Sequence, residues 1–429
     1  MRWFFRFSSW LSLALVLPSP VLAEETPAPV LQLEEVVAEG LQHNPALIAA
    51  QERWRAARLR VPQASALPDP MLGYAVMGTM LETRLGPQEN VVDVEQTVPF
   101  PGKLWKRRQM AAAEANAAQA QMEAAKLDII VQLSAVYYDL YATDATIATV
   151  EELHDTFKRL ESVAQARYGA QGGSQRDVAK AQAELSGTEE TLVTLRQRRQ
   201  SLAARLNALL DRDPDTPAGH TVTPELPTVS ATGEQLVDIA KQHRPELREA
   251  SAMVTRDQHA QALAKLEYLP DVSVGFEYSQ IGSGKTTDPD DGRDAWMVPL
   301  KVNIPLWQNR LVPSVLEARR NLKASQARAA QEENTAEYEV KDAYFRFTSA
   351  KQIVELHRNA LIPEAELAFR SDQAGYEAGR VDILNLIDSE RLYLNAQVTF
   401  YQALAEALKS HAALERAVGT TLTTEGDRS

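Results

Sequence analysis

Two runs of the chain, VSVGFEY at residues 272–278 and WMVPLKVNI at residues 296–304, alternate apolar with polar side chains. A period of two is that of a β-strand, and it places the apolar side chains on one face of a hairpin and the polar ones on the other. Strands of transmembrane barrels have this pattern. A soluble sheet that packs one face on a core has it too, so the hairpin alone leaves both interpretations open.

Outward from this hairpin, the chain repeats itself. QHNPAL at 42–47 recurs as QHRPEL at 242–247, an offset of 200 residues. Further markers recur in the same order, with offsets that only grow, to 208: LPD at 67–69 and 269–271, VPF at 98–100 and IPL at 304–306, Tyr168 and Tyr376, Leu206 and Leu414. Ordered markers of this kind indicate an internal duplication.

Each copy predicts the order helix, hairpin, long helix, turn, helix. A break is expected at Asn44-Pro45, because proline disfavours a helical residue before it, and a kink is expected at Pro363, because proline removes a helix hydrogen bond. In the first copy we expect a helix over 33–66, strands near 71–77 and 91–98, a helix over 103–167 about 95–100 Å long, a turn at 168–174 and a helix over 175–210. In the second copy we expect a helix over 233–269, strands near 272–278 and 296–304, a helix over 308–375, a turn at 376–381 and a helix over 381–418.

The N-terminus has the features of an export signal. Arg2 and Arg6 precede an apolar stretch at 10–17, and Val21-Leu22-Ala23 is similar to a cleavage site, so we expect a signal peptide at 1–23. A membrane-spanning helix needs about 18 apolar residues, and this segment is shorter. The expected organisation is therefore a signal peptide (1–23), a first repeat (24–210), a linker (211–232), a second repeat (233–418) and a C-terminal tail (419–429).

The composition excludes several classes of function. The formal net charge of −13 argues against nucleic acid as a partner, because phosphates require basic surface. The chain has no Cys, which excludes disulfides, thiolate metal sites and a Cys nucleophile. The seven His are scattered without metal-ligand spacing, and no catalytic constellation is present. We therefore expect no enzyme activity, no catalytic residues, no metal site and no cofactor.

Export, and the lack of a spare amphipathic helix to cover the apolar face, favour a membrane location for the hairpins. An open sheet edge in lipid leaves backbone groups unpaired at several kcal/mol each, so the sheet must close. Two hairpins supply four strands. Two chains would form eight strands around an interior filled by side chains, whereas three chains would form twelve strands around a channel.

Several motifs of the chain resemble those of the TolC-like outer-membrane efflux family. They are Leu41 with Asn44-Pro45, LPDP at 67–70, QTVPFPGK at 96–103, the turn with Arg167-Tyr168, Gly173 and Asp177-Val178, and its copy with Tyr376, Gly379 and Asp382-Ile383-Leu384. The resemblance covers the whole chain after the signal peptide. The combination of PDP with PFPGK is most similar to the heavy-metal branch of CusC-like and CzcC-like proteins.

The resemblance implies a mainly α homotrimer of two-repeat chains. A twelve-stranded transmembrane β-barrel in the outer membrane would continue into a long periplasmic α-helical barrel. Such a duct passively conducts what an inner-membrane pump, of the resistance-nodulation-division type, expels through a periplasmic adaptor protein. Its partners would be this pump, this adaptor and outer-membrane lipid, and its cargo would include heavy-metal ions.

The resemblance also implies roles for two sets of residues. The two turns would dock the adaptor, through Arg167, Tyr168, Gly172, Gly173, Ser174, Tyr376, Gly379 and Arg380. The turns differ in sequence, since the first has Gln171 before Gly172-Gly173 where the second has Gly379. Junctions between strands and helices would lie at Pro68, Pro70, Pro99, Pro101, Gly102, Pro270 and Pro305. The alternative for the turns is a purely structural connection between helices.

Charged residues beside the second turn are candidates for a gate. Asp372 lies four residues before Tyr376, and three copies of it would form an acidic ring that favours cations and resists closure. Arg370 and Arg167 are candidate partners in a latch between helices. Solvated charges on a helix face are the alternative.

Four methionines, Met71, Met77, Met80 and Met297, gather at the expected barrel. Thioethers suit Cu(I), although Met also fills lipid-facing or pore-facing surfaces. Two rival functions remain: the exit duct of a type I protein secretion or drug efflux system, and a periplasmic coiled-coil scaffold that enters no membrane.

Overall fold

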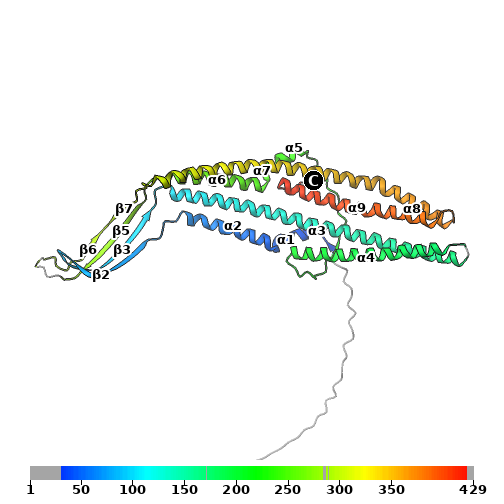
Figure 1. Ribbon diagram of the computed structural model, residues 1–429, viewed down its shortest axis with the longest axis horizontal. Coiled ribbons are helices and arrows are strands. Elements are labelled where there is room, and N and C mark those ends of the chain that lie inside the picture. Colours follow the sequence, from blue (N-terminus) through cyan, green and yellow to red (C-terminus); the bar gives the residue numbers. More distant parts are fainter. Residues whose placement is uncertain (1–29, 171, 284–286, 288, 423–429) are drawn as a thin grey trace, which may run out of the picture.

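The structure is a computed structural model that describes residues 30–170, 172–283, 287 and 289–422. The expected signal peptide (1–23) and the last residues of the expected tail (423–429) lie outside these residues. The molecule is elongated, with a sheet at one end, a layer of long helices, and two helix-to-helix turns at the other end (Figure 1).

The helices of the first half are α1 (Leu33–His43), α2 (Pro45–Ala64), α3 (Lys103–Gly169) and α4 (Gln175–Leu209). The break expected at Asn44-Pro45 separates α1 from α2. Asn44 is extended, and its side-chain oxygen accepts hydrogen bonds from the backbone N–H groups of Ala46 and Leu47, at 3.0 and 3.2 Å. This is the usual chemistry of a helix N-cap, with Pro45 at the first helical position.

The helices of the second half are α5 (Gly233–His243), α6 (Pro245–Leu266), α7 (Gln308–Leu356), α8 (Ile362–Glu377) and α9 (Ile383–Val418). A π-helical turn, η1 (His357–Leu361), connects α7 to α8. The interruption expected at Pro363 therefore lies just before it. Pro363 cannot donate to the carbonyl of Asn359, and the wider turn accommodates this carbonyl.

The main sheet is antiparallel and contains β2 (Met71–Thr83), β3 (Gly86–Val98), β5 (Val272–Ile281), β6 (Ala295–Met297) and β7 (Leu300–Val302). The order is β2-β3-β5, and both β6 and β7 pair with β5. The β3–β5 ladder joins the two halves of the chain, from Val98 opposite Val272 to Gln88 opposite Ile281. A two-residue parallel ladder joins β1 (Val30–Leu31) to β4 (His220–Thr221).

The strand expected at 296–304 is wrong as a continuous element. It is interrupted between β6 and β7, at Val298 and Pro299. Proline has no N–H to give to the ladder, although its carbonyl still accepts a 2.9 Å hydrogen bond from the N–H of Gly275. The strands expected near 71–77, 91–98 and 272–278 are longer in the structure than the alternating patterns indicated.

The register of the sheet separates its two faces. Leu72, Val94 and Phe276 lie opposite one another across three strands, and so do Tyr74, Val92, Tyr278 and Trp296. All of these side chains are exposed, Leu72 to 74% and Trp296 to 69%. The apolar face of the sheet is therefore uncovered in the single chain.

The helices form one layer in which α3 is central. Near the sheet, α2 and α6 pack on α3, and α7 packs on α6; near the far end, α4 and α9 pack on α3, and α8 packs on α9. Small side chains of α3, from Ala111 to Ala120, are buried where α2 and α6 approach. The layer thus has two open edges, one formed by α2 and α4 and the other by α7 and α8 (Figure 1).

Candidate functional site

The two helix-to-helix turns lie together at the end of the molecule opposite the sheet (Figure 1). One turn connects α3 to α4 and the other connects α8 to α9. A shared cluster of buried side chains lies behind them and includes Phe157 and Leu160 of α3 and Ile383 and Leu386 of α9. We name this end the tip.

Arg167, at the end of α3, connects the two turns directly. Its Nη2 donates hydrogen bonds to the backbone carbonyls of Tyr376 and Glu377, at 2.7 and 2.9 Å. Its guanidinium also lies over the Tyr376 ring, 4.7 Å from the centroid. Burial raises the pKa of the Tyr376 phenol, and Arg167 opposes part of this increase. The latch expected for Arg167 therefore has backbone carbonyls and an aromatic ring as partners.

The second turn ends α8 with a Schellman motif. The N–H of Arg380 donates to the carbonyl of Gly375 at 2.8 Å, and the N–H of Gly379 donates to that of Tyr376 at 2.9 Å. Gly379 has φ of +72°, which glycine adopts without the strain that a side chain would add. Gly379 and Arg380 are exposed, so a partner could reach them.

The first turn has a different construction. A Cβ added at Gly173 would lie 2.9 Å from both the Arg167 Cβ and the Tyr168 N atom, so only glycine fits against the end of α3 there. The Ser174 hydroxyl accepts a 3.0 Å hydrogen bond from the N–H of Arg176 and caps α4. Gly172, Ser174 and Tyr168 are exposed. The two turns present different surfaces, as their sequences indicate.

Gly375 is a tip residue that the sequence analysis missed. Any Cβ at this position would collide with the Val381 side chain, which folds back on α8 after the turn. A glycine four residues before Gly379 was the only signal in the sequence, and it becomes informative only once the turn geometry is known.

The structure places the two gate candidates on α8 without bringing them together. Arg370 is exposed and forms an ion pair with Glu366, one turn earlier on the same helix. Asp372 is half-buried and forms no ion pair with another residue in the described part of the chain.

A buried carboxyl group, Glu390 on α9, lies between the tip and the middle of the helical layer. Its side chain is 2% exposed, and its Oε2 atom has no hydrogen-bond partner among the described residues. Burial, assisted by the nearby Glu184 and opposed by Arg159, raises the pKa of Glu390 to about 8. A cavity of about 50 Å³ adjoins it, lined by Thr149 and Thr156 of α3 among others.

The predicted junction residues lie between the sheet and the helices. Pro68, Pro70 and Pro270 precede strands, whereas Pro99, Pro101, Gly102 and Pro305 lie between a strand and the next helix. Gly102 has φ of +99° and forms the N-cap of α3.

Lys103 connects the junctions of the two halves, and no pattern in the sequence indicates that it is buried. Its side chain is 1% exposed, and its Nζ donates to the Asp271 Oδ1 at 2.8 Å and to the Leu269 carbonyl at 2.9 Å. The same Asp271 oxygen accepts a 2.7 Å hydrogen bond from the N–H of Phe100. The loops that enter α3 and β5 are therefore fixed to each other.

Three of the four methionines can be placed on the polar face of the sheet or its continuation. Met71 lies directly opposite Glu95, and Met297 directly opposite Glu277. Met71 and Met297 are exposed, and Met77 is half-exposed. Met80 belongs to β2. Lys301 forms a 2.5 Å ion pair with Glu95, the carboxylate opposite Met71. Glu277, opposite Met297, has no ion pair among the described residues, so the two Met–Glu pairs differ in net charge.

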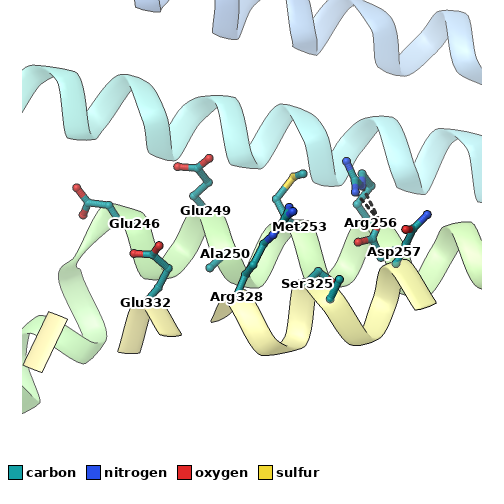
Figure 2. A pocket seen from close by; sticks show the side chains of 11 residues that line it. Glu246, Glu249, Ala250, Met253, Arg256, Asp257, Ser325, Arg328 and Glu332 are labelled. Carbon is teal, nitrogen blue, oxygen red and sulfur yellow. Dashed lines mark hydrogen bonds and ion pairs between the residues drawn. The ribbon is translucent and has the colours of Figure 1, made fainter. Parts of the chain in front are cut away.

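A cavity of about 460 Å³ lies between α6 and α7, where Glu249 and Met253 extend toward α3 (Figure 2). Two of its carboxylates form ion pairs, Asp257 with Arg256 and Glu246 with Arg416, and Glu249 accepts a hydrogen bond from the Gln121 amide. Among the described residues, no cluster of three or more His, Cys, Asp or Glu is arranged to hold a metal ion. No helix in the described ranges has the length and apolar composition to cross a membrane.

Comparisons with known proteins match this chain along nearly all of its length. A family model described as outer membrane efflux protein matches residues 36–212 and 236–420. The cobalt-zinc-cadmium resistance protein CzcC of Cupriavidus metallidurans is 20% identical over 404 residues, 93% of this chain and 92% of that protein.

Two crystal structures have a similar fold. CusC matches with a TM-score of 0.77 at 16% identity, over 96% of this chain and 99% of that chain. VceC of Vibrio cholerae matches with a TM-score of 0.74 at 21% identity, over 91% of this chain and 97% of that chain.

Proposed function

The chain belongs to the outer membrane efflux protein family, and from this premise we propose that it is the outer-membrane exit duct of a tripartite efflux system. The duct passively conducts what an inner-membrane pump expels through a periplasmic adaptor. The observation that carries the proposal is the double match of the family model, once to each half of the chain. Two matches in tandem also support an internal duplication, with repeats at 24–210 and 233–418.

Three copies of the chain complete the duct. The strands β2, β3, β5 and β6/β7 alternate in direction, so β2 of one copy runs antiparallel to β6 and β7 of the next. A head-to-tail interface of this kind closes by rotation. Twelve strands then remove the open edges that lipid would leave unpaired. The open edges of the helical layer meet in the same way and continue the barrel into the periplasm.

The tip is the docking surface for the adaptor. Arg167 holds the two turns together, and Tyr168, Ser174, Gly379 and Arg380 are exposed around them. A helical hairpin of the adaptor would contact both turns as one surface. The unequal construction of the turns gives each copy two different contacts for an adaptor.

Asp372 lines the closed entrance at the tip. Three copies form an acidic ring that repels itself and favours cations. Asp372→Ala should raise the single-channel conductance of the reconstituted protein, with Glu364→Ala, an exposed change on the same helix, as the control. An unchanged conductance would discard this gate.

Heavy-metal cations are the proposed cargo. The relative CzcC is named for resistance to cobalt, zinc and cadmium. The polar face of the sheet, which faces the lumen in a closed barrel, pairs Met71 with Glu95 and Met297 with Glu277. Thioethers suit soft metal ions and carboxylates attract cations of every kind.

A deletion strain with plasmid rescue tests the function. Its susceptibility to copper, silver, zinc, cobalt and cadmium salts is compared with its susceptibility to dyes, detergents and antibiotics. Sensitivity to metals alone, reversed by the plasmid, is the expected result. Sensitivity to drugs and detergents alone would contradict the metal cargo but keep the efflux duct, and a protein secretion defect without either would assign the duct to type I secretion.

A further inference from the structure

The ends of the helices that face the sheet carry basic residues and no acidic ones. In the eight residues of α2, α3, α6 and α7 nearest to the sheet (57–64, 103–110, 259–266 and 308–315) there are eight Lys and Arg and no Asp or Glu. The whole chain has the opposite balance, with 58 Asp and Glu against 45 Lys and Arg. The basic charge is therefore concentrated beside the sheet.

Most of these basic side chains are accessible in the single chain. Arg58, Arg60, Arg107, Arg108, Lys265 and Arg310 are exposed, and every one of the four helices contributes at least one of them. We name these six residues the collar. Glu267, just past the end of α6, lies 3.7 Å from Arg107. Arg60, Arg108, Lys265 and Arg310 have no carboxylate partner within the described residues.

The helix dipole accounts for little of the collar, because its effect is confined to the first and last turns of a helix. Of the collar residues on α2 and α6, which end at the sheet, only Lys265 lies in a last turn. α3 and α7 begin at the sheet, where the dipole favours acidic residues, yet neither has an acidic residue in its first turn. Arg310 lies in the first turn of α7, where the dipole disfavours a basic residue, and an external negative charge would compensate for this.

Aromatic side chains lie at the same level as the collar. Trp105 is 56% exposed and Trp307 72% exposed, and both lie within the first turn or the N-cap of their helices. Lys106 Nζ lies over the Trp105 ring, 4.3 Å from the centroid. Trp is enriched where a protein passes from the hydrocarbon to the aqueous phase, and Lys and Arg extend toward headgroups there. The uncovered apolar face of the sheet begins next to these helix ends.

We infer that the collar binds the headgroups of anionic phospholipids in the membrane leaflet that the sheet-proximal helix ends face. The ligand class is a phosphatidylglycerol-type lipid, whose phosphate accepts hydrogen bonds from guanidinium groups. The binding fixes the depth of the sheet in the bilayer and anchors the helical layer to the membrane surface. The inference rests on the proposed insertion of the sheet.

The test uses the full-length protein reconstituted into bilayers of phosphatidylglycerol and phosphatidylcholine. In a background with Trp54→Phe and Trp296→Phe, Trp105 and Trp307 report on the lipids beside the collar, because lipids with brominated acyl chains quench nearby Trp fluorescence. The relative binding constant of the two lipids is measured for the wild type and for the triple variant Arg60→Gln/Arg108→Gln/Arg310→Gln. The matched control, Lys158→Gln/Lys180→Gln/Arg198→Gln, removes three exposed charges far from the sheet.

The wild type and the control should prefer phosphatidylglycerol, and 0.5 M salt should weaken this preference. In the collar variant, the relative binding constant for phosphatidylglycerol should be at least about tenfold lower than in the wild type. The reason is that each basic residue near an anionic surface contributes roughly fivefold to the binding constant. Equal preference in both triple variants, or none in the wild type, would overturn the inference. The inference would also be overturned if the collar variant kept its lipid preference and changed only the ion selectivity of the channel, because the collar would then face the lumen. In a second background with Trp54→Phe, Trp105→Phe and Trp307→Phe, a Trp296 fluorescence that neither brominated lipid quenches would instead contradict membrane insertion, and with it the proposed function.

Discussion

At the scale of single residues, two kinds of position determine the local structure: glycines in the tight turns, and charged groups buried between the helices and at the junctions. Gly173 and Gly379 could be singled out because tight turns demand glycine, and their geometry agrees. The burial of Lys103 could not be predicted, because its partner Asp271 lies 168 residues away in the chain. Glu390 is similar: its helix reads as an ordinary amphipathic segment, and only packing against α3 shows that its carboxyl is enclosed.

Glu390 should make the stability of the protein depend on pH. Its pKa is raised to about 8 in the folded protein from a usual value of 4.5. Between these values the folded state holds a proton that the unfolded state has lost, so the free energy of unfolding falls as pH rises, by about 1.4 kcal/mol per unit for each chain. Glu390→Gln should reduce the dependence of the thermal midpoint on pH between pH 5 and 8. Glu189→Gln, at an exposed position, should keep the slope of the wild type, and an equal slope in both variants would show that Glu390 is ionised when folded.

Lys103→Met should destabilise the junction between sheet and helices. The substitution leaves the Asp271 carboxylate without its cation, at a cost of about 3 kcal/mol. The thermal midpoint of the purified protein should fall, and the double variant Lys103→Met/Asp271→Asn should recover part of the loss. Lys126→Met, an exposed change on the same helix, is the control. A single variant as stable as this control would contradict a structural role for the pair.

At the scale of elements, prolines predict where the helices break. The alternation of apolar and polar side chains does not predict where a strand is interrupted. Asn44-Pro45 and Arg244-Pro245 each separate two helices at the same point of each half. Pro363 was expected to kink a helix, and the structure has a π-helical turn directly upstream of it. The alternation of apolar and polar side chains in WMVPLKVNI predicted one continuous strand. It did not predict the interruption at Pro299, because side-chain polarity carries no information about a missing backbone N–H.

Arg167 should control how tightly the two turns hold together. Its hydrogen bonds connect the end of α3 to the end of α8, and few other polar contacts between these ends are present among the described residues. Arg167→Ala should speed amide hydrogen exchange at residues 376–381 by about tenfold, equivalent to about 1.4 kcal/mol of local stability. Arg176→Ala, an exposed change in the other turn, should leave this exchange unchanged. Unaltered exchange in both variants would show that the turns are held by the apolar cluster alone.

At the scale of the whole molecule, the sequence predicted the family, the location and the order of elements. The resemblance to outer-membrane efflux proteins is confirmed by the family match, and the relative CzcC is consistent with the heavy-metal branch. Closure could not be read from one chain, because the apolar face of the sheet and both edges of the helical layer remain open in it. In the proposed trimer, the apolar face of the sheet contacts lipid and the edges of the helical layer contact further copies.

A cysteine-free chain allows a direct test of closure. With Tyr74→Cys on β2 and Val298→Cys beside β6, a short thiol-specific crosslinker should connect each copy to the next in membranes. Denaturing gels should then show bands of one, two and three chains and nothing larger. Either single variant alone should stay at one chain. A ladder that ends at two chains would favour an eight-stranded assembly, and one that continues beyond three would exclude a closed trimer.

The β3–β5 ladder has a consequence for biogenesis. Its strands come from opposite halves of the chain, so β3 has no partner on that side until residues up to 281 have been made and exported. Pairings so distant along a chain form slowly, because a long loop must be closed before any contact compensates for it. For this interval the first hairpin presents an apolar face and an unpaired edge to the periplasm, a combination that aggregates. We therefore expect a newly made chain to be most prone to aggregation before the second hairpin is complete.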